Sequence, residues 1–576
     1  MSRVFSRFSA LAFMVMCLGL TSAASNADAG TPMFRFYRAT SGEHFFTGTF
    51  SEGVNAGLKS EGIGFQFYSS SGIGRIAIYR CYASGWHFIS TASNCGGSTV
   101  EGQYGWIDSG QISGTVALQG YYQSATGDRI YTTDSAEGTA VLDRGYSSLG
   151  TLGYVPAYTV TTASGQACDG STNDTSVLQT AITNAAGGHL IIPAGSGACM
   201  VDGLSIPSNT QVTVNATLKL RPNQSTALNG DGTRNILNAY WASTVVIDGT
   251  GVLDGNRANQ TASGIFMAGI GTLYADTVMI LRPTDTSTIA VGGLTIKNTQ
   301  NSPINVVATS GAVMQDVTAF DSGNPVEFAG DTSNCSADGL RIYNINPPGV
   351  TSEAGFAFYG GAHSCALRNS VVSNSTFGVL VLNDSAQAGQ NHDILVDNVE
   401  VYAMDSVGAG LIVATNSGLT SYNYNITFQN SRAHGSANNY LNINGTNVTF
   451  TSIDTTGSTS SKSQILGYID GFGATGSGKY DLYGWSCTTY NPDPVYVALY
   501  IGSTAAGWGR ANQLSETAVG SACASGGRAH RYVIHFSASQ ITTWQGQTVS
   551  VFGISPWGFA NNSLIGTGTT TVPNPY

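Results

Sequence analysis

The central stretch of the chain, from about Val212 to Thr456, repeats a short segment of alternating apolar residues that closes on Asn or Asp. Six of these segments end at Asn298, Asp316, Asn344, Asn369, Asn398 and Asn430. The gaps between those end residues are 18, 28, 25, 29 and 32. Helical arrays have nearly constant unit lengths, whereas stacked coils of strand tolerate loops of variable length. The pattern therefore predicts an all-β fold, a right-handed parallel β-helix over residues 165–458.

Alternation within each segment indicates which side chains point inward. In stacked coils each strand pairs with the coils above and below it, so inward side chains must be apolar or small. The repeated Asn predicts a single corner of the coil, where amide side chains stack one per coil and bond each other and the turn backbone.

The first 24 residues have the features of a signal peptide. Arg3 and Arg7 give a positive start, Ala10–Leu20 is apolar, and Ser22-Ala23-Ala24 supplies small residues for cleavage. No later segment is apolar over the length that a membrane span needs. We expect a secreted, periplasmic or extracellular protein.

The net charge of the chain disfavours some classes of binding partner. The chain has a formal net charge of −11, and removing residues 1–24 with their two arginines takes it to −13. This balance disfavours binding to nucleic acid or to anionic membranes. With 73 glycines and only 10% charged residues, the composition suits a β-rich exported protein with many tight turns.

Eight cysteines remain outside the signal peptide, and they fall into four sequence-neighbouring pairs. The pairs are Cys81/Cys95, Cys168/Cys199, Cys335/Cys365 and Cys487/Cys523. In an exported chain this even count predicts disulfides, with free buried thiols as the alternative. The C-x-x-C spacing of a structural zinc site is absent, and we expect no metal there.

Residues 32–158 contain three related units. Tyr37, Tyr79 and Tyr121 open them at intervals of 42 residues, and each unit continues into a Gly-x-His-Phe or similar segment. The repeat predicts a pseudo-threefold, trefoil-like β module. It resembles a Y-R-x-Y…G-x-H-F-x-T repeat of bacterial exported proteins, although the third unit has Arg129 in place of His. Its aromatic residues either bind carbohydrate or form the core of the module.

A short amphipathic helix is predicted after Cys168. Asp174 or Thr175 can cap it, and the apolar residues that follow have helical spacing: Val177, Leu178, Ala181, Ile182 and Ala185. Such a helix would cover the open end of the β-helix core, which would otherwise expose apolar side chains and unpaired backbone.

Several elements between Cys168 and Asn305 carry a family resemblance. The elements are D-G-x-x-x-D-T-x-x-L-Q-x-A-I, I-P-A-G, S-N-T, A-T-L, I-D-G-x-G-x-L-D-G and Asn301-Ser302-Pro303. They resemble the opening of pectate-lyase-superfamily and polygalacturonase-like β-helices. This resemblance implies the fold, but hydrolases, lyases, epimerases and phage tailspikes share the opening.

The coil pattern ends near Thr459. Residues 459–576 contain short apolar runs that predict an antiparallel, sandwich-like module. The runs are 467–470, 484–487, 495–501, 532–536 and 548–553. This module either binds carbohydrate or covers the end of the β-helix.

The candidate site is a group of acids in the middle of the β-helix. Polygalacturonase-like enzymes carry N-T-D, Asp-Asp, G-H-G and R-I-K segments, and this sequence keeps none of them intact. Asn324-Pro325-Val326-Glu327 stands where N-T-D is expected, and Glu353–Tyr359 stands at the Asp-Asp position. The predicted catalytic residues are Asp321, Glu327, Asp331, Glu353 and Asp384, with Tyr359 and His363 as substrate-binding residues. We expect Glu327 and Glu353 to occupy corresponding places on consecutive coils. The alternative is that these acids are solvated turn residues.

Three functions follow from this pattern. The first is a polysaccharide-degrading glycoside hydrolase with paired carboxylates and no cofactor. The second is a polysaccharide lyase. A lyase needs a base to take the proton and a cation or an Arg or Lys side chain to stabilise the anion, and Arg341, Arg368 and Arg432 are available. Ca²⁺ is a possible cofactor only under this second hypothesis. The third is a non-catalytic, adhesive carbohydrate-binding protein. The expected partner is a polysaccharide in each case, and the oligomeric state is left open.

Overall fold

A computed structural model describes most of the chain between Gly30 and Asn574. The described ranges are 30–38, 41–229, 232–260, 265–281, 293–345, 354–383, 389–402, 409–416, 419, 422–434, 438–455, 464–476, 479–489, 494–524, 529–554, 563–565 and 570–574. The predicted signal peptide and two candidate catalytic residues, Glu353 and Asp384, lie outside these ranges.

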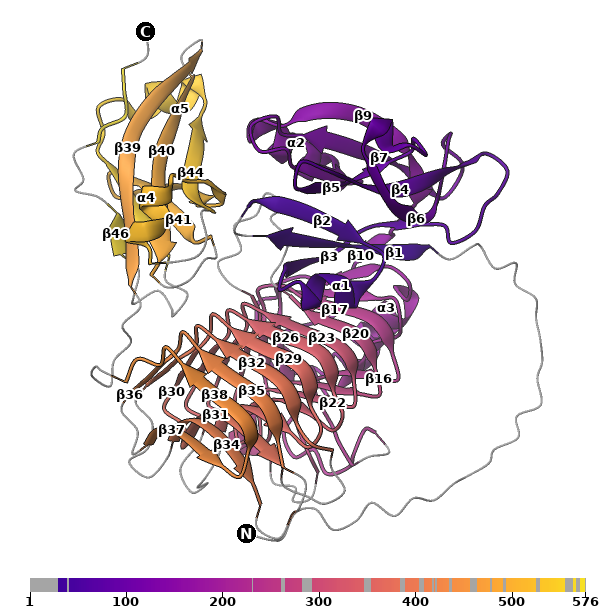
Figure 1. Ribbon diagram of the computed structural model, residues 1–576, viewed down its shortest axis with the longest axis vertical. Helices are drawn as coiled ribbons and strands as arrows, with labels where there is room; N and C mark the ends of the chain where they lie inside the picture. Colours follow the sequence, from indigo (N-terminus) through magenta and orange to yellow (C-terminus); the bar gives the residue numbers. More distant parts are fainter. Residues whose placement is uncertain are drawn as a thin grey trace.

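The central part is a right-handed parallel β-helix built of three long parallel sheets, as predicted (Figure 1). The first sheet contains β10 (Val160–Thr162), β11 (His189–Ile192), β14 (Gln211–Val214), β17 (Ser243–Asp248), β20 (Asp276–Ile280), β23 (Ser310–Gln315), β26 (Ser333–Asp338), β29 (His363–Arg368), β32 (His392–Asp397), β35 (Tyr424–Gln429) and β38 (Thr446–Thr451). The second contains β12 (Ala198–Val201), β15 (Thr217–Leu220), β18 (Val252–Asp254), β21 (Thr295–Lys297), β24 (Thr318–Phe320), β27 (Arg341–Tyr343), β30 (Val371–Ser373), β33 (Glu400–Tyr402) and β36 (Arg432–His434). The third contains β13 (Leu204–Ser205), β16 (Leu237–Tyr240), β19 (Ile270–Leu273), β22 (Ile304–Val307), β25 (Val326–Ala329), β28 (Ala354–Tyr359), β31 (Phe377–Asn383), β34 (Ala409–Thr415) and β37 (Asn438–Ile443).

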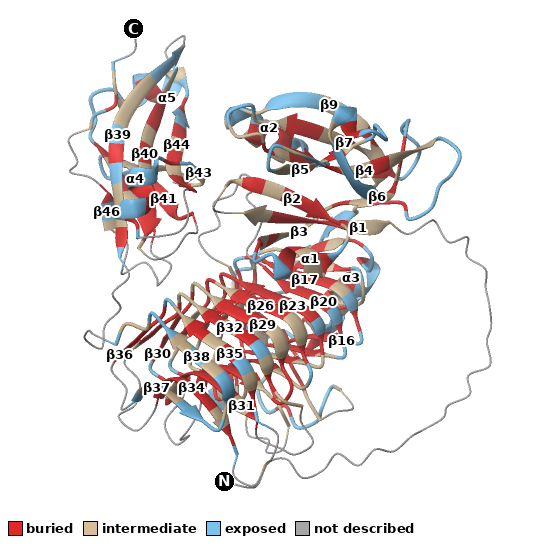
Figure 2. Ribbon diagram, in the orientation of Figure 1, coloured by how far each residue is buried: buried red, intermediate tan, exposed pale blue. Residues whose placement is uncertain are grey.

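Alternate side chains of all three sheets fill one continuous apolar core. Figure 2 shows many residues along the strands of the coil coloured as buried. The predicted helix is α3 (Thr175–Asn184), with Asp174 at its N-cap, and a 3-10 turn spans Arg257–Asn259. Leu178 and Ile182 of α3 belong to the same core as the first coils. The helix therefore covers the end of the β-helix, as predicted.

The polar ladder forms two corners of the coil, so the prediction of a single corner is wrong. Asp316, Asn369, Asn398 and Asn430 follow strands of the first sheet, whereas Asn298, Asp321, Asn344 and Asn374 follow strands of the second. All have positive φ. Asn344 Nδ2 donates to Asp321 Oδ1 at 3.1 Å, and Asn374 Nδ2 donates to Asn344 Oδ1 at 3.1 Å. Both corners need a residue with left-handed backbone, a conformation that Asn and Asp tolerate. Strands of both sheets therefore end on the same residue types, and the two ladders cannot be told apart in the sequence.

The N-terminal module has three copies of one topology, in which a hairpin is followed by a short helix and a strand that pairs beside the hairpin. The copies are β1 (Thr31–Arg38), β2 (Glu43–Thr47), α1 (Phe50–Asn55), β3 (Lys59–Phe67); β4 (Arg75–Ala83), β5 (Trp86–Ser90), the 3-10 turn Cys95–Gly97, β6 (Thr99–Asp108); and β7 (Thr115–Tyr122), β8 (Arg129–Thr132), α2 (Ser135–Asp143), β9 (Ser147–Pro156). Large aromatic residues of the module are buried in its core.

The repeated Gly-x-His segment joins neighbouring copies. His44 Nδ1 lies 2.6 Å from Asp128 Oδ2, and His87 Nδ1 lies 2.8 Å from Glu43 Oε1. Burial by itself lowers the pKa of His44, but Asp128 and Glu61 reverse this and raise the pKa above its ordinary value. Arg129, the departure in the third unit, stacks over Phe88 instead. In the first two units, this segment therefore joins one repeat to another.

The C-terminal module is a sandwich of two antiparallel sheets, as predicted. One sheet contains β39 (Ile465–Gly476), β40 (Lys479–Thr488), β44 (Ala529–Phe536) and β43 (Gln513–Leu514), and the other β42 (Thr504–Arg510), β41 (Tyr496–Ile501), β45 (Val549–Gly553) and β46 (Ser563–Ile565). Two short helices, α4 (Thr517–Ala522) and α5 (Ala538–Trp544), complete it. Both sheets contribute to one core, for example through Leu482 and Leu499.

All four predicted cysteine pairs form disulfides. Within the described residues, no helix has the length and apolar character needed to cross a membrane.

Candidate functional site

The outer face of the third sheet carries two of the predicted site residues, Glu327 and Tyr359. Glu327 lies in β25 and Tyr359 ends β28, and these two strands are neighbours in the sheet. Val326 and Phe328 point into the core, so Glu327 between them points outward. The strand thus carries one carboxylate on its outer face.

Glu327 is nonetheless largely covered, with 9% of its surface exposed. The Ser302 hydroxyl donates a hydrogen bond of 2.7 Å to Glu327 Oε1, and Ser302 itself is fully buried. Asn305 is the register partner of Glu327 on β22. Ser302, Asn305 and Glu327 form a polar group on adjacent strands, about 4.8 Å apart. A carboxyl held by a hydroxyl donor in a sheltered place can exchange a proton with a substrate oxygen.

Glu327 and Glu353 do not occupy corresponding places on the two coils. The register partner of Glu327 on β28 is Ala357, four residues after Glu353. Ala357, Leu380 and Ile412 continue the outward row across β28, β31 and β34 as a buried apolar cluster. The outer face therefore changes from polar to apolar immediately after Glu327.

Two other predicted acids lie at opposite ends of the third-sheet strand. Asp321 precedes β25 and belongs to the amide ladder through Asn344. Asp331 follows β25 and is exposed, with φ of 61°. Asp321 thus has a structural partner, whereas Asp331 remains open to solvent at the turn that leads into the first sheet.

The two predicted substrate-binding residues lie near that same turn. Tyr359 ends β28 and pairs with Ala329, which makes it a diagonal neighbour of Glu327 on the outer face. His363 opens β29 and stacks on His392, with ring centroids 4.7 Å apart, and His392 stacks in turn on Tyr424. Partial burial and the neighbouring His392 lower the pKa of His363. The surroundings of His363 therefore favour its neutral form.

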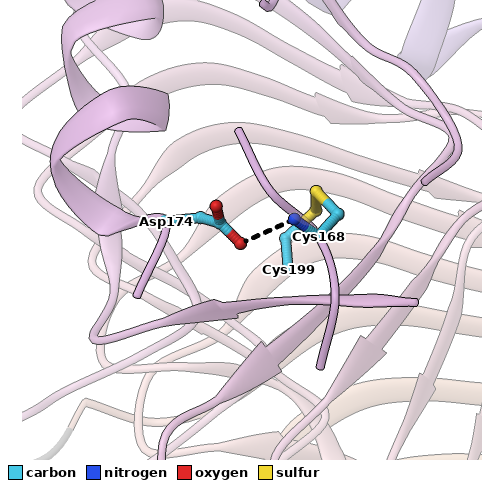
Figure 3. Close-up of side chains that lie close together, drawn as sticks. All are labelled: Cys168, Asp174 and Cys199. Atoms are coloured by element: carbon cyan, nitrogen blue, oxygen red, sulfur yellow. Dashed lines mark hydrogen bonds between the residues drawn. A yellow bond between two sulfur atoms is a disulfide. The ribbon is translucent and has the colours of Figure 1, made fainter. Parts of the chain in front are cut away.

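A cluster with the composition of a metal site lies at the start of the β-helix, where Cys168, Asp174 and Cys199 meet (Figure 3). The two cysteines form a disulfide, which leaves no thiolate to bind a metal. The Asp174 carboxylate accepts hydrogen bonds from the Ala167 and Cys168 backbone N–H groups, at 2.6 and 3.1 Å. The cluster therefore has a structural role and connects the start of α3 to the first coil.

Sequence reasoning missed a buried acid beneath the N-terminal module. A cavity of about 150 Å³ lies between the module and the first sheet, and it is lined by Arg35, Glu61, Glu137, Tyr158, Gln211 and Asp248, among others. Burial raises the pKa of Asp248 to about 6, although Thr213 and Gln211 donate hydrogen bonds to it. Burial also lowers the pKa of the adjacent His189 to about 4. Asp248 stands in the I-D-G element, but its cover comes from residues about 200 positions away.

Comparisons with known proteins bear on parts of this architecture. A family model described as a domain of unknown function (DUF5648) matches residues 18–112. No curated protein matches the chain.

Several solved structures are similar to the chain. The A-module of mannuronan C-5 epimerase AlgE6 from Azotobacter vinelandii is 20% identical, with a TM-score of 0.41, over 50% of this chain and 74% of that one. An exopolygalacturonase from Thermotoga maritima is 13% identical, with a TM-score of 0.33, over 52% and 92% of the two chains. The enzymatically active domain of tailspike protein 2 from bacteriophage CBA120 is 13% identical, with a TM-score of 0.27, over 71% and 74%. At these identities the likeness concerns the fold alone.

Proposed function

We propose that this chain is a secreted enzyme that hydrolyses a polysaccharide along the outer face of the third sheet. The observation that supports this most is Glu327, a sheltered outward carboxylate that accepts a hydrogen bond from Ser302. An extended polymer lies well along stacked strands, because their spacing of about 4.8 Å is close to the length of one sugar unit. The four disulfides suit an exported protein.

Hydrolysis of a glycosidic bond uses two carboxyl groups. One protonates the leaving oxygen, and the other activates water or attacks the sugar directly. We assign the proton exchange to Glu327 and draw the second carboxylate from Asp331 and Glu353, which each stand four residues from Glu327 or from its register partner Ala357. Tyr359, the diagonal neighbour of Glu327, would orient the sugar.

The test is incubation with a panel of polysaccharides. A hydrolase releases reducing ends without the ultraviolet absorbance of an unsaturated sugar, whereas a lyase acting on a uronic-acid polymer produces both. Retention of a polymer without any new reducing ends would indicate a binding protein and would refute hydrolysis.

Substitution then tests the residues. Glu327→Gln should lower kcat/KM by roughly 10²- to 10⁴-fold, the range for loss of general acid–base catalysis. Asp331→Asn and Glu353→Gln identify the second carboxylate, because only the true partner should cause a comparable loss. The control is Asp143→Asn, an exposed acid in the N-terminal module, which should leave the rate unchanged. Full activity in Glu327→Gln would end this assignment.

A further inference from the structure

The corner between the third and the first sheet requires a left-handed residue on each of five successive coils. The five residues, with φ between 46° and 56°, are Trp241, Tyr274, Ala308, Gly330 and Gly360. The Trp241 backbone N–H donates to the Leu273 carbonyl at 2.9 Å, and the Tyr274 N–H donates to the Val307 carbonyl at 3.3 Å. These hydrogen bonds fix the corner and its left-handed turn.

Two aromatic residues occupy positions that suit them poorly. Left-handed backbone favours Gly and Asn, and it is unfavourable for bulky side chains. Trp241 is also 71% exposed and Tyr274 is 55% exposed, so neither side chain gains much from burial in a core. Residues that reduce local stability without filling a core are commonly retained for function.

The two rings form a flat stack along the axis of the β-helix. Their centroids are 4.6 Å apart with an angle of 28° between the planes, which is close to one coil step. The next two corner residues are Ala308 and Gly330, and a Cβ on Gly330 would lie only 2.9 Å from Val307 Cγ1. The corner beyond Tyr274 therefore carries only small residues as far as the exposed Asp331.

Hydrogen-bonding groups lie on and just before β16, the strand that leads to Trp241. Tyr240 precedes Trp241, and its hydroxyl lies 2.6 Å from Thr233 Oγ1 and 3.1 Å from Asn235 Nδ2. Tyr240 and Thr233 are both partly exposed. Flat exposed rings, with hydroxyl groups on the strand that precedes them, suit a ligand that has an apolar face and polar hydroxyl groups.

We propose that Trp241 and Tyr274 form a carbohydrate-binding platform that stacks against the pyranose rings of a polysaccharide running along this corner. The axial C–H bonds of a pyranose with equatorial hydroxyls carry partial positive charge, and they complement the negative face of an aromatic ring. The ring hydroxyls then meet the Tyr240 and Thr233 hydroxyls. This platform is separate from Glu327, and binding to it does not require that Glu327 be catalytic.

Binding to soluble polymers tests the proposal. Full-length protein is run by affinity electrophoresis in gels that contain β-glucan, xylan, galactan, alginate or pectate, while melting temperature and elution volume are measured in parallel. The variants are Trp241→Gly, Tyr274→Gly and Trp241→Phe. The control is Tyr422→Ala, which removes a 41% exposed tyrosine from a later coil of the β-helix, outside both flanking modules.

We expect Trp241→Gly and Tyr274→Gly to weaken the apparent Kd for the bound polymer about tenfold, the scale of one aromatic stacking contact. Their melting temperatures should stay the same or rise, because Gly suits the left-handed corner, whereas a purely structural role would lower them. Trp241→Phe should retain most of the binding, and Tyr422→Ala should bind like the wild type.

Four results would overturn the platform. They are unchanged retention of Trp241→Gly, an equal loss in Tyr422→Ala, a wild-type protein that no polymer in the panel retains, and a change in elution volume of Trp241→Gly without a change in retention. The last result would identify a contact between copies of the chain. Loss of hydrolysis in Glu327→Gln with retention intact would separate this site from the proposed catalytic one.

Discussion

The outer faces of the first and third sheets belong to the same β-helix but meet different neighbours. On the first sheet, Val246, Met279 and Val313 point outward and pack against Phe34, Phe36 and Phe50 of the N-terminal module in one buried cluster. Figure 1 shows the module lying over this face, beside β17, β20 and β23. On the third sheet, the outward row is polar at Asn305 and Glu327 and becomes apolar from Ala357 onward. The first-sheet row joins two modules, whereas the polar part of the third-sheet row carries a carboxylate.

The comparison also shows how the two faces treat charge. Asp248 lies at the edge of the covered face and is fully buried there, so its pKa is raised to about 6. Glu327 has a hydroxyl donor within 2.7 Å. Asp248 also accepts hydrogen bonds, from Thr213 and Gln211, so burial beneath the module raises its pKa despite these donors.

The largest expected effect is an acid placed in the covered face. Met279→Asp puts an unpaired charge at a fully buried position and should lower the free energy of unfolding by about 3–5 kcal/mol. Leu273→Asp, on the partly exposed third-sheet face, should cost clearly less. Chemical denaturation with limited proteolysis of the N-terminal module measures both. An equal loss of unfolding free energy in the two variants would show that the two faces do not differ.

The next effect is a pH dependence in the covered face. Because the folded protein holds the Asp248 proton more tightly than the unfolded chain, stability should fall as pH rises from about 4 to about 6. Asp248→Asn removes this loss and should raise the free energy of unfolding by about 3 kcal/mol at pH 7, with no difference below pH 4. Urea midpoints across this pH range measure the change.

A control acid should show the opposite sign. Asp169 is exposed and accepts hydrogen bonds from the Thr172 and Ser171 N–H groups, which hold its pKa below the usual range. Asp169→Asn should therefore lose stability at neutral pH, and that loss should shrink on acidification. A benefit of Asp248→Asn that grew on acidification would contradict the burial argument.

The smallest effect concerns the open face. Ser302→Ala removes the hydrogen bond to Glu327 and should lower kcat about tenfold, since a hydrogen bond to a charged group contributes about 1.5 kcal/mol or more. Because Glu327 acts as the general acid, the alkaline limb of the pH–rate profile should move to higher pH when the carboxyl group loses the Ser302 hydrogen bond. Ser302→Thr keeps a hydroxyl and should restore most of the rate. A fall in melting temperature with an unchanged pH profile would make Ser302 structural only.

The amino-acid sequence by itself determined the fold class, the helix that starts after Asp174 and all four disulfides. Each of these depends on local information: alternation with a period of two, a polar residue before an apolar stripe of helical spacing, or cysteines that are neighbours in the sequence. Only the tertiary structure decided that the Asn ladder occupies two corners and that Ala357, not Glu353, is the register partner of Glu327. It alone placed Trp241 on Tyr274 and Asp248 beneath the N-terminal module. The register between two strands depends on the lengths of the loops that join them, and these lengths vary. The residues that bury Asp248 come from segments distant in the sequence. No local sequence pattern therefore encodes the strand register or the burial.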